Sequence, residues 1–333
     1  MVTAVDFETL SLAEIIRLKD ELSQVLKRRF ERNLCLGFTD VVGSTAYFSR
    51  FGDEAGRGLQ QRHFDALNAV LTQNGGRIVD TAGDGAFTCW QSVEGALLAM
   101  ITMQDVITQQ NQSRPREHQL SVRIGIHWGA VLTDGVVVTG DAVNLAARVA
   151  SSGTPGEMRL TRQAFQELSN TSRIRCRGLP PIELKGITKP VDLVVYEWRD
   201  RMLFPSHVRV EETGEDITLP QQDTISFGRL REKDGVPAND IVLSLPDKQM
   251  TQQISRWHFE LRRRNDGFML RPVSDQATEV DGQVIQKGAD VAIRPGVVVR
   301  LSRVMTLTFM ADPLFGGASG ADDTLLKETL APR

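Results

Sequence analysis

This sequence has few cysteines, no long hydrophobic run and only a small excess of charge of one sign. The three cysteines, Cys35, Cys89 and Cys176, lack the spacing of a disulfide framework or a zinc site, and two of them lie in apolar segments. We therefore expect free thiols that behave as small hydrophobic side chains in a reducing compartment. A net charge of -3 over 333 residues argues against a general nucleic-acid binder, which would carry a basic stripe.

No apolar run is long enough to span a bilayer, and no signal-peptide pattern opens the chain. These absences predict a cytoplasmic protein without a membrane span. The chain is long enough for two domains, and its 41% of hydrophobic residues can fill their cores.

The segment 77–90 organises the first half of the chain. Two short apolar strands flank Ala82-Gly83-Asp84-Gly85, which is a strong hairpin signal. The two glycines that flank this acid let a bulky anion approach the backbone closely. A second acid, Asp40, follows the apolar strand 34–38. If the two strands are neighbours, their aspartates can share a pair of Mg²⁺ ions, although each acid alone is more often a turn residue or a helix cap.

Helical patterns surround these strands. Residues 6–32 read as one helix, with an apolar stripe that fits a parallel dimer seam as well as packing within the chain. Gly43-Ser44-Thr45 opens the next helix, where free backbone N–H groups can hold phosphate. The polar run 109–118 predicts a solvated loop. Asn144 and Arg148 share one helix face four residues apart, on a helix whose other neighbours are apolar, so we expect both to need partners.

Strand, helix, strand, strand, helix and strand follow one another up to this point, which is the order of a split βαβ, ferredoxin-like α+β domain. Five motifs punctuate that order: FTDVVGST at 38–45, TAGDGAF at 81–87, VRIGIHWG at 122–129, GDAVNLAAR at 140–148 and IELKGITKPVDLVVYEW at 182–198. With these motifs, residues 34–200 resemble the catalytic domain of class III nucleotidyl cyclases, the adenylate and guanylate cyclase family. The N-terminal helix, 1–33, precedes that domain.

The resemblance implies two Mg²⁺ or Mn²⁺ ions per site and a nucleoside triphosphate substrate. It also implies a head-to-tail homodimer, because the family builds each site from two subunits. The implied metal-binding residues are Asp40, Asp84 and Val41. The implied catalytic residues are Asn144, which would orient the ribose, Arg148, which would stabilise the transition state, and Arg123. The implied substrate-binding residues are Asp80, Val137, Lys185, Ser44 and Thr45.

The base-reading positions depart from the family pattern. Adenylate cyclases usually carry a lysine where this chain has Asp80, and an Asp or Thr where it has Val137. An ionised carboxylate only accepts hydrogen bonds, so Asp80 suits the donor edge of guanine, whereas valine reads nothing. The product could therefore be cyclic AMP, cyclic GMP or a cyclic pyrimidine nucleotide. The alternative for Asp80 is that it points elsewhere and that backbone groups select the base.

Short strands with turn signals between them predict an all-β sandwich over residues 205–310. The segments SFGR at 226–229, NDI at 239–241, SRWH at 255–258 and TEVDG at 278–282 make this stretch resemble a forkhead-associated (FHA) domain, a phosphothreonine reader. The resemblance implies a phosphopeptide pocket made by Arg229, Ser255, Arg256 and Gln276, with His258 as a brace of the loop. Gln276 stands where the family has asparagine, and Ala277 where it has glycine, so a phosphate-independent docking role is the alternative.

The tail, 311–333, is rich in Gly, Ala and Asp and predicts disorder. One hypothesis is that Thr324 or Thr329, once phosphorylated, docks on the FHA pocket of the same chain or of a dimer partner; the alternatives are a separate phosphothreonine protein as the ligand and a tail without a role. Two function classes follow for the whole chain. One is an active cyclase regulated through the FHA domain, and the other is a catalytically weak, cyclase-like signalling scaffold.

Overall fold

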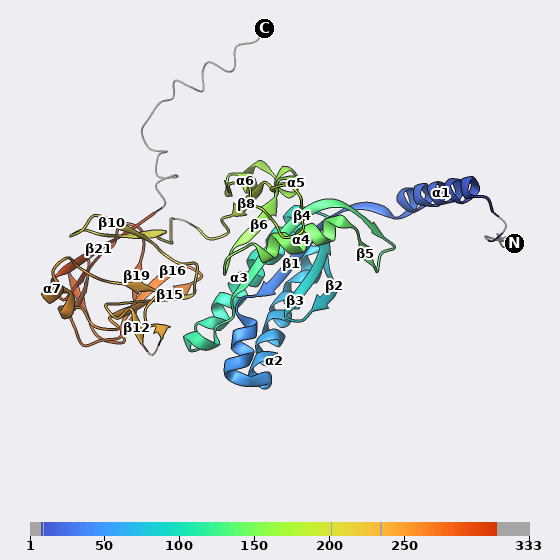
Figure 1. Cartoon of the computed structure of the whole chain (residues 1–333). Helices are drawn as coiled ribbons and strands as arrows, with labels where there is room; N and C mark the ends of the chain where they lie inside the picture. Colours follow the sequence, from blue (N-terminus) through green and yellow to red (C-terminus); the bar gives the residue numbers. More distant parts are fainter. Residues whose placement is uncertain (1–7, 9, 201, 234, 312–333) are drawn as a thin grey trace, which may run out of the picture. The chain divides into compact units, whose positions relative to one another are not determined.

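The computed structural model describes residues 8, 10–200, 202–233 and 235–311. The chain divides into two compact units (Figure 1). The first comprises the described residues up to Ile107 together with Leu120–Trp198, and the second comprises Thr108–Gln119 together with the described residues from Arg199 onward. Thr324 and Thr329 lie outside the described residues. In the part of the chain that the structure describes, no helix has the length and apolarity to cross a membrane.

The first unit is built on one mixed sheet. Its strands are β1 (Glu31–Val41), β2 (Gly76–Ala82), β3 (Gly85–Trp90), β4 (Val122–Thr133), β5 (Val138–Thr139), β6 (Met158–Thr161), β7 (Cys176–Gly178) and β8 (Leu193–Tyr196). They pair in the order β2-β3-β1-β4-β6-β8-β7, with β5 beside β4. Helix α2 (Ser44–Leu71) joins β1 to β2, and α3 (Val93–Asn111) lies between β3 and β4. The strands β2-β3-β1-β4 thus have the predicted ferredoxin-like order.

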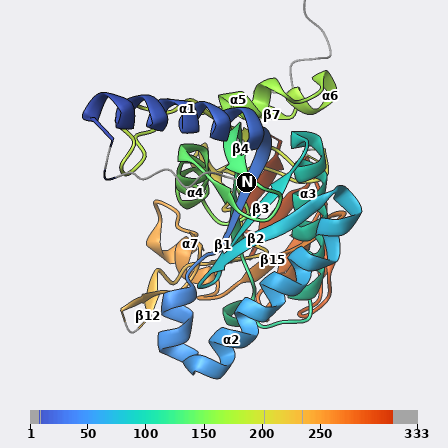
Figure 2. The same cartoon turned by 90° about the vertical axis from the view of Figure 1, so that its right-hand side faces the viewer.

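Helices cover both faces of this sheet (Figure 2). Successive side chains of β1 point to opposite faces, so Cys35 packs with α2 and α3 while Leu36 packs with α4 (Asp141–Ser151). Gly125 of β4 lets α4 lie directly on the strand, because a Cβ there would meet the Ala150 nitrogen at 2.2 Å. This contact fixes α4 above the end of the sheet where β1 stops. Short helices α5 (Arg162–Gln166), α6 (Asn170–Arg173) and η2 (Thr72–Asn74) complete the unit.

Helix α1 (Leu12–Phe30) precedes β1 and buries none of its residues. Ser11 and Glu14 form a capping box at its start. The apolar stripe is exposed, with Leu12 at 75% and Leu22 at 54%. Packing of the stripe within the chain is therefore not observed, and the dimer seam stays a prediction.

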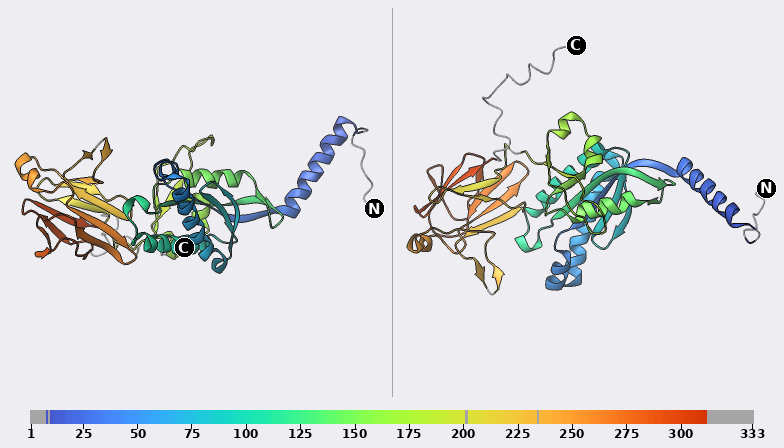
Figure 3. Two further views of the ribbon diagram at one scale, coloured as in Figure 1. Left: turned by 90° about the horizontal axis from the view of Figure 1, so that it is seen from below. Right: turned by 45° about the horizontal axis from the view of Figure 1, so that its top comes forward.

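The second unit is an all-β sandwich, as predicted. Its elements are β9 (His207–Val210), β10 (Glu215–Thr218), β11 (Thr224–Gly228), β12 (Glu232–Lys233), β13 (Val236–Pro237), β14 (Ile241–Val242), α7 (Lys248–Gln253), β15 (Phe259–Arg264), β16 (Gly267–Pro272), β17 (Thr278–Val280), β18 (Gln283–Ile285), β19 (Val291–Ile293), β20 (Val298–Leu301) and β21 (Met305–Met310). The sheets β10-β9-β21-β20-β17-β18 and β14-β11-β15-β16-β19 face each other (Figure 3). Between them, Phe227 stacks on Phe259 with ring centroids 4.3 Å apart.

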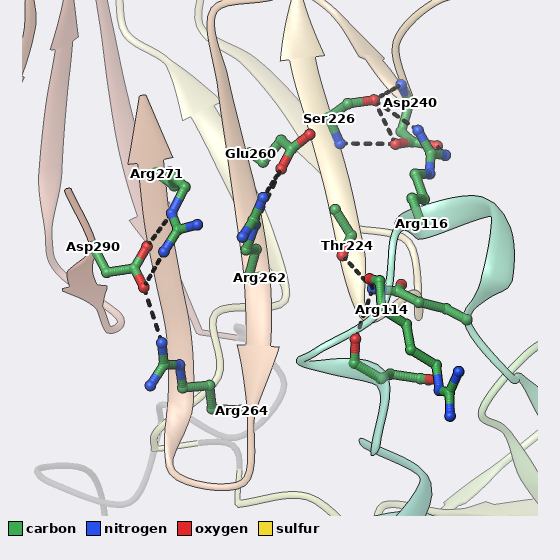
Figure 4. Close-up of polar contacts among 12 residues, drawn as sticks. Arg114, Arg116, Thr224, Ser226, Asp240, Glu260, Arg262, Arg264, Arg271 and Asp290 are labelled. Carbon is green, nitrogen blue, oxygen red and sulfur yellow. Dashed lines mark hydrogen bonds and ion pairs between the residues drawn. The ribbon is translucent and has the colours of Figure 1, made fainter. Parts of the chain in front are cut away.

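Residues Thr108–Gln119, which include η3 (Arg116–His118), belong to this second unit. The predicted solvated loop is thus wrong in part. Asn111 is 1% exposed and donates to Asp223 Oδ2 at 2.7 Å. Arg116 donates to Ser226 Oγ at 3.0 Å and pairs with Asp240 (Figure 4). These polar side chains are satisfied by carboxylates and a hydroxyl more than a hundred positions later in the chain, which local sequence cannot reveal.

Candidate active site

The two predicted metal-binding aspartates lie together at one end of the sheet. Strands β1 and β3 are antiparallel neighbours, with Thr39 opposite Ala86. The next positions, Asp40 and the Asp84-Gly85 turn, are therefore adjacent. The Cβ position of Gly85 lies 3.8 Å from Asp40 Oδ1. The condition set by the sequence, that the two strands be neighbours, is met.

The Asp84 carboxylate is suited to a cation. Gly83 before it has φ +62°, in the left-handed region that glycine adopts at little cost, so the turn can present the acid. Asp84 Oδ2 is buried and accepts no hydrogen bond from the described residues. A buried carboxylate oxygen without a partner is costly, and a divalent cation would supply the missing positive charge. Val41, the third implied metal residue, has its side chain in the core at 3% exposure, which leaves only its backbone to face a metal.

Arg123 of β4 holds the other carboxylate. It stands opposite Asp40 in the strand register, and its Nε donates to Asp40 Oδ2 at 2.8 Å. Its Nη1 donates to the Ser151 carbonyl at 2.9 Å, at the end of α4. Arg123, which the resemblance implies as a catalytic residue, thus orients Asp40 in this structure. Asp40 Oδ1 stays on the side of the Asp84-Gly85 turn.

The residues predicted to hold phosphate lie at exposed or half-buried positions. Helix α2 begins at Ser44 after Gly43, whose φ is +73°, and no side chain caps its first turn. Thr45 and Lys185 are exposed, and Lys185 lies in the connection between β7 and β8. The backbone N–H groups at the start of α2 come only a few residues after Asp40 in the chain. A phosphate bound there would therefore lie near the carboxylates.

Asn144 and Arg148, which the sequence predicts to need partners, are exposed on α4. Neither side chain makes a hydrogen bond or an ion pair with another residue that the structure describes. The apolar flanking residues Ala146 and Val149 face the sheet instead. The polar pair is therefore available to a group outside this chain.

The two base-reading positions are also exposed. Asp80, near the end of β2, accepts the Thr81 backbone N–H at 2.8 Å. Val137 is 58% exposed, and its backbone N–H donates to Asp134 Oδ1 at 2.9 Å.

His63 is a site residue that the sequence reasoning missed. It is fully buried on α2, and its ring nitrogens lie 2.9 Å from Asp84 O and 2.9 Å from Thr39 Oγ1. Burial lowers the pKa of His63 below its ordinary value. The available signal was a histidine at helical spacing within the apolar face made by Leu59 and Leu67.

Residues 26–197, just over half of the chain, match the family model described as the adenylate and guanylate cyclase catalytic domain. The chain belongs to this family. An adenylate cyclase of Streptomyces coelicolor is 32% identical over 178 residues, which cover 52% of this chain and 41% of the relative. An adenylate cyclase of Mycosarcoma maydis is 30% identical over 161 residues, which cover 40% of this chain and 6% of the relative. The chain spans less than half the length of these curated relatives.

Solved structures of cyclases are similar to the first unit. The adenylyl cyclase CyaB of P. aeruginosa is 22% identical, with a TM-score of 0.44, and the match covers 50% of this chain and 94% of that one. Residues 225–302, which follow the matched cyclase domain, match the FHA domain model. The resemblance to both families is confirmed.

The FHA domain of this cyclase-family chain brings its four predicted phosphopeptide residues together. They line a pocket of about 450 Å³, whose lining is Arg229, Gln252, Gln253, Ile254, Ser255, Arg256, Trp257 and Gln276. Arg229 Nε is buried and has no hydrogen-bond partner among the described residues. An unpaired guanidinium donor beside a serine hydroxyl and a second arginine is the chemistry of a phosphate pocket.

The loops that carry these residues are braced from below. His258 is fully buried, and its Nδ1 accepts the Ser255 backbone N–H at 3.2 Å, so the predicted bracing role is confirmed. Burial lowers the pKa of His258 to about 4, which keeps the ring neutral. Asn239 donates to the Leu230 and Arg256 carbonyls at 2.8 Å each. The pocket is therefore held by buried polar groups.

Proposed function

We propose that this chain converts a nucleoside triphosphate into a 3′,5′-cyclic nucleotide and pyrophosphate. The observation that carries the proposal is the meeting of Asp40 Oδ1 with the Asp84 turn, where a buried carboxylate oxygen lacks a partner. Two carboxylates together with substrate phosphates form the ligand set that Mg²⁺ commonly uses in nucleotide enzymes. Family membership supports the same reaction.

In the proposed reaction, a bond forms between the ribose 3′-oxygen and the α-phosphorus. The bond from that phosphorus to the pyrophosphate oxygen breaks, with its electron pair leaving on the pyrophosphate, and the 3′-hydroxyl proton passes to solvent water. A pair of divalent cations on Asp40 and Asp84 would acidify the hydroxyl and neutralise the leaving group. Lys185 and the N-terminus of α2 would bind the phosphates. Arg123 orients Asp40 toward this task through its 2.8 Å hydrogen bond.

The active form is proposed to be a head-to-tail homodimer. Asn144 and Arg148 are exposed and have no partner among the described residues of their own chain. Placed in the site of a second copy, Asn144 would orient the ribose, and Arg148 would neutralise charge developing on the phosphate. A donor positioned for the transition state is worth roughly 3–4 kcal/mol of barrier.

A product assay tests the proposed function. Purified protein is incubated with ATP, GTP, CTP and UTP in turn, each with Mg²⁺ and with Mn²⁺, and the cyclic nucleotide and pyrophosphate are quantified. A cyclic product with an equimolar amount of pyrophosphate supports the proposal. Nucleotide binding without any product would instead favour the signalling scaffold.

We predict that Asp80→Lys shifts base preference toward ATP. The exposed carboxylate can accept from the guanine edge, whereas lysine donates to the adenine edge. A hydrogen bond that involves a charged group is worth about 1.5–3 kcal/mol, so the ratio of kcat/KM for ATP over GTP should rise about 10- to 100-fold. Val137→Ala serves as the control, because valine makes no side-chain hydrogen bond. An unchanged ratio for Asp80→Lys would show that other groups choose the base.

We further propose that the FHA domain regulates the cyclase by binding phosphothreonine. The pocket offers Arg229, Ser255 and Arg256 to one phosphate, which supports phosphate-dependent binding over phosphate-independent docking. Candidate ligands are a separate phosphothreonine protein and the chain's own tail. Gln276 would contact the peptide backbone in place of the family's asparagine.

Arg229→Ala is expected to weaken phosphothreonine binding about 10- to 100-fold, because it removes a charge-assisted donor. Binding is measured by titration with a degenerate phosphothreonine peptide library and with a tail peptide phosphorylated on Thr324. Arg209→Ala is a matched control, since it removes an arginine on β9 that pairs with Asp216 on the neighbouring strand β10, in the sheet that does not contain β11. Equal affinity of the Arg229 variant and the parent for every peptide would contradict phosphate reading by this pocket.

A further inference from the structure

One buried side chain links the two segments that carry the metal-binding aspartates. His63 projects from α2 with no exposed surface, within the apolar cluster made by Leu59 and Leu67. One ring nitrogen reaches the backbone of Asp84 itself, and the other reaches Thr39, the residue before Asp40. Both contacts are 2.9 Å. The imidazole ring of His63, which belongs to neither β1 nor the β2–β3 turn, therefore connects the two by hydrogen bonds.

The partners fix the state of this ring. A carbonyl oxygen only accepts hydrogen bonds, so Nδ1 must carry the proton that it donates to Asp84 O. In the neutral ring Nε2 then accepts from the Thr39 hydroxyl. Burial lowers the pKa of His63, which agrees with this neutral form. Each nitrogen thus has one partner of the matching kind.

The turn around Asp84 receives a contact from outside its own hairpin. Asp84 lies between two glycines, and the pairing of β2 with β3 ends at Ala82 and Gly85. Glycines lose the most backbone freedom when they are fixed. The contact of His63 with the Asp84 carbonyl supplies a restraint that the hairpin does not contain.

We propose that His63 is a positioning residue that holds the Asp84 turn against the end of β1, so that both carboxylates stand ready for a shared pair of divalent cations. The inference rests on the proposed function and adds to it a residue that contacts neither metal nor nucleotide. Groups that orient metal ligands in this indirect way typically contribute about 10- to 100-fold to metal affinity.

Two substitutions separate the two hydrogen bonds. The side-chain amide of asparagine extends about as far as ring Nδ1, and that of glutamine about as far as Nε2. His63→Asn can therefore keep the donor to the Asp84 carbonyl, whereas His63→Gln keeps only the partner on the Thr39 side. We expect His63→Gln to weaken metal binding about 10- to 100-fold and His63→Asn to recover most of that loss.

The measurement is the dissociation constant of Mn²⁺, followed by electron paramagnetic resonance on the full chain with a 3′-deoxynucleoside triphosphate. This nucleotide lacks the attacking hydroxyl, so binding is read without turnover. The matched control is His127→Gln. His127 on β4 is 4% exposed and its Nδ1 lies 2.9 Å from Thr161 Oγ1, so its loss also removes a buried histidine–threonine contact. The control should lower thermal stability and leave the Mn²⁺ constant unchanged.

Unchanged Mn²⁺ affinity in His63→Gln would overturn the inference, and so would an equal loss in His127→Gln. If neither His63 variant folds, Thr39→Val decides, because it removes only the hydroxyl and keeps the side-chain shape; it should weaken Mn²⁺ binding several-fold, and no change would overturn the inference. Failure of the proposed function is a separate result, namely a parent protein that makes no cyclic nucleotide.

Discussion

Asp40→Ala will reduce cyclic nucleotide formation by at least about 10³-fold. The substitution removes one of the two carboxylates that would hold the cations, and several kcal/mol of transition-state stabilisation depend on those cations. It also leaves the Arg123 guanidinium without the carboxylate that it contacts at 2.8 Å. The measurement is kcat/KM for the preferred nucleoside triphosphate at saturating Mg²⁺ and again at saturating Mn²⁺.

The matched control for this experiment is Asp192→Ala. Asp192 also pairs with an arginine of the first unit, Arg162 at 3.5 Å, but both side chains are exposed at the surface. Exposed ion pairs contribute about 0–1 kcal/mol to stability, so the control should fold and turn over normally. Thermal unfolding of both variants separates loss of chemistry from loss of fold. Normal product formation by a folded Asp40→Ala protein would refute the metal assignment.

Mixing two inactive variants will restore activity. Arg148→Ala alone should lower kcat about 10²- to 10³-fold, as loss of a transition-state donor does. In a head-to-tail dimer, each site takes Asp40 from one copy and Arg148 from the other. A mixed dimer of Asp40→Ala and Arg148→Ala then has one intact site and one doubly altered site. With random pairing, half of the dimers are mixed, so about a quarter of the parent activity should return.

The controls for this mixing experiment are each variant alone and each variant mixed with an inactive double variant that carries both substitutions. Neither control mixture contains an intact composite site, so neither should recover. The variants must be refolded or co-expressed together so that subunits exchange. Stable mixed dimers without recovered activity would show that both residues act within one chain, and the exposure of Arg148 would then need another explanation.

The sequence predicted those parts of the site that depend on local patterns and strand order. The glycine-flanked acid at Asp84 marks a hairpin, and the polar end of an apolar strand marks Asp40. Their meeting follows from the ferredoxin-like order, which places β1 beside β3. The residues predicted to bind a phosphopeptide lie together for a similar reason, because the short loops at one end of a sandwich are close in space.

Contacts across long separations escaped the sequence reasoning. The hydrogen bonds of Arg123 to Asp40 and of His63 to Thr39 depend on the register of β4 and on the rotation of α2. Neither quantity is encoded in a short pattern. For Asn144, helix periodicity predicted the face that it shares with Arg148 but could not show whether that face meets its own sheet or another molecule.

The membership of Thr108–Gln119 in the second unit bears on how this chain can be cut and recombined. The backbone passes between the units at three places, after residues 107, 119 and 198. A gene fragment that stops at residue 200 would therefore leave the Asn111 amide without Asp223 and the Arg116 guanidinium without Asp240. Joining the second unit to another catalytic domain would require both of its segments, Thr108–Gln119 and the residues from Arg199 onward, to be transferred together. The two units are thus interleaved along the chain, and the second cannot be excised as one continuous segment.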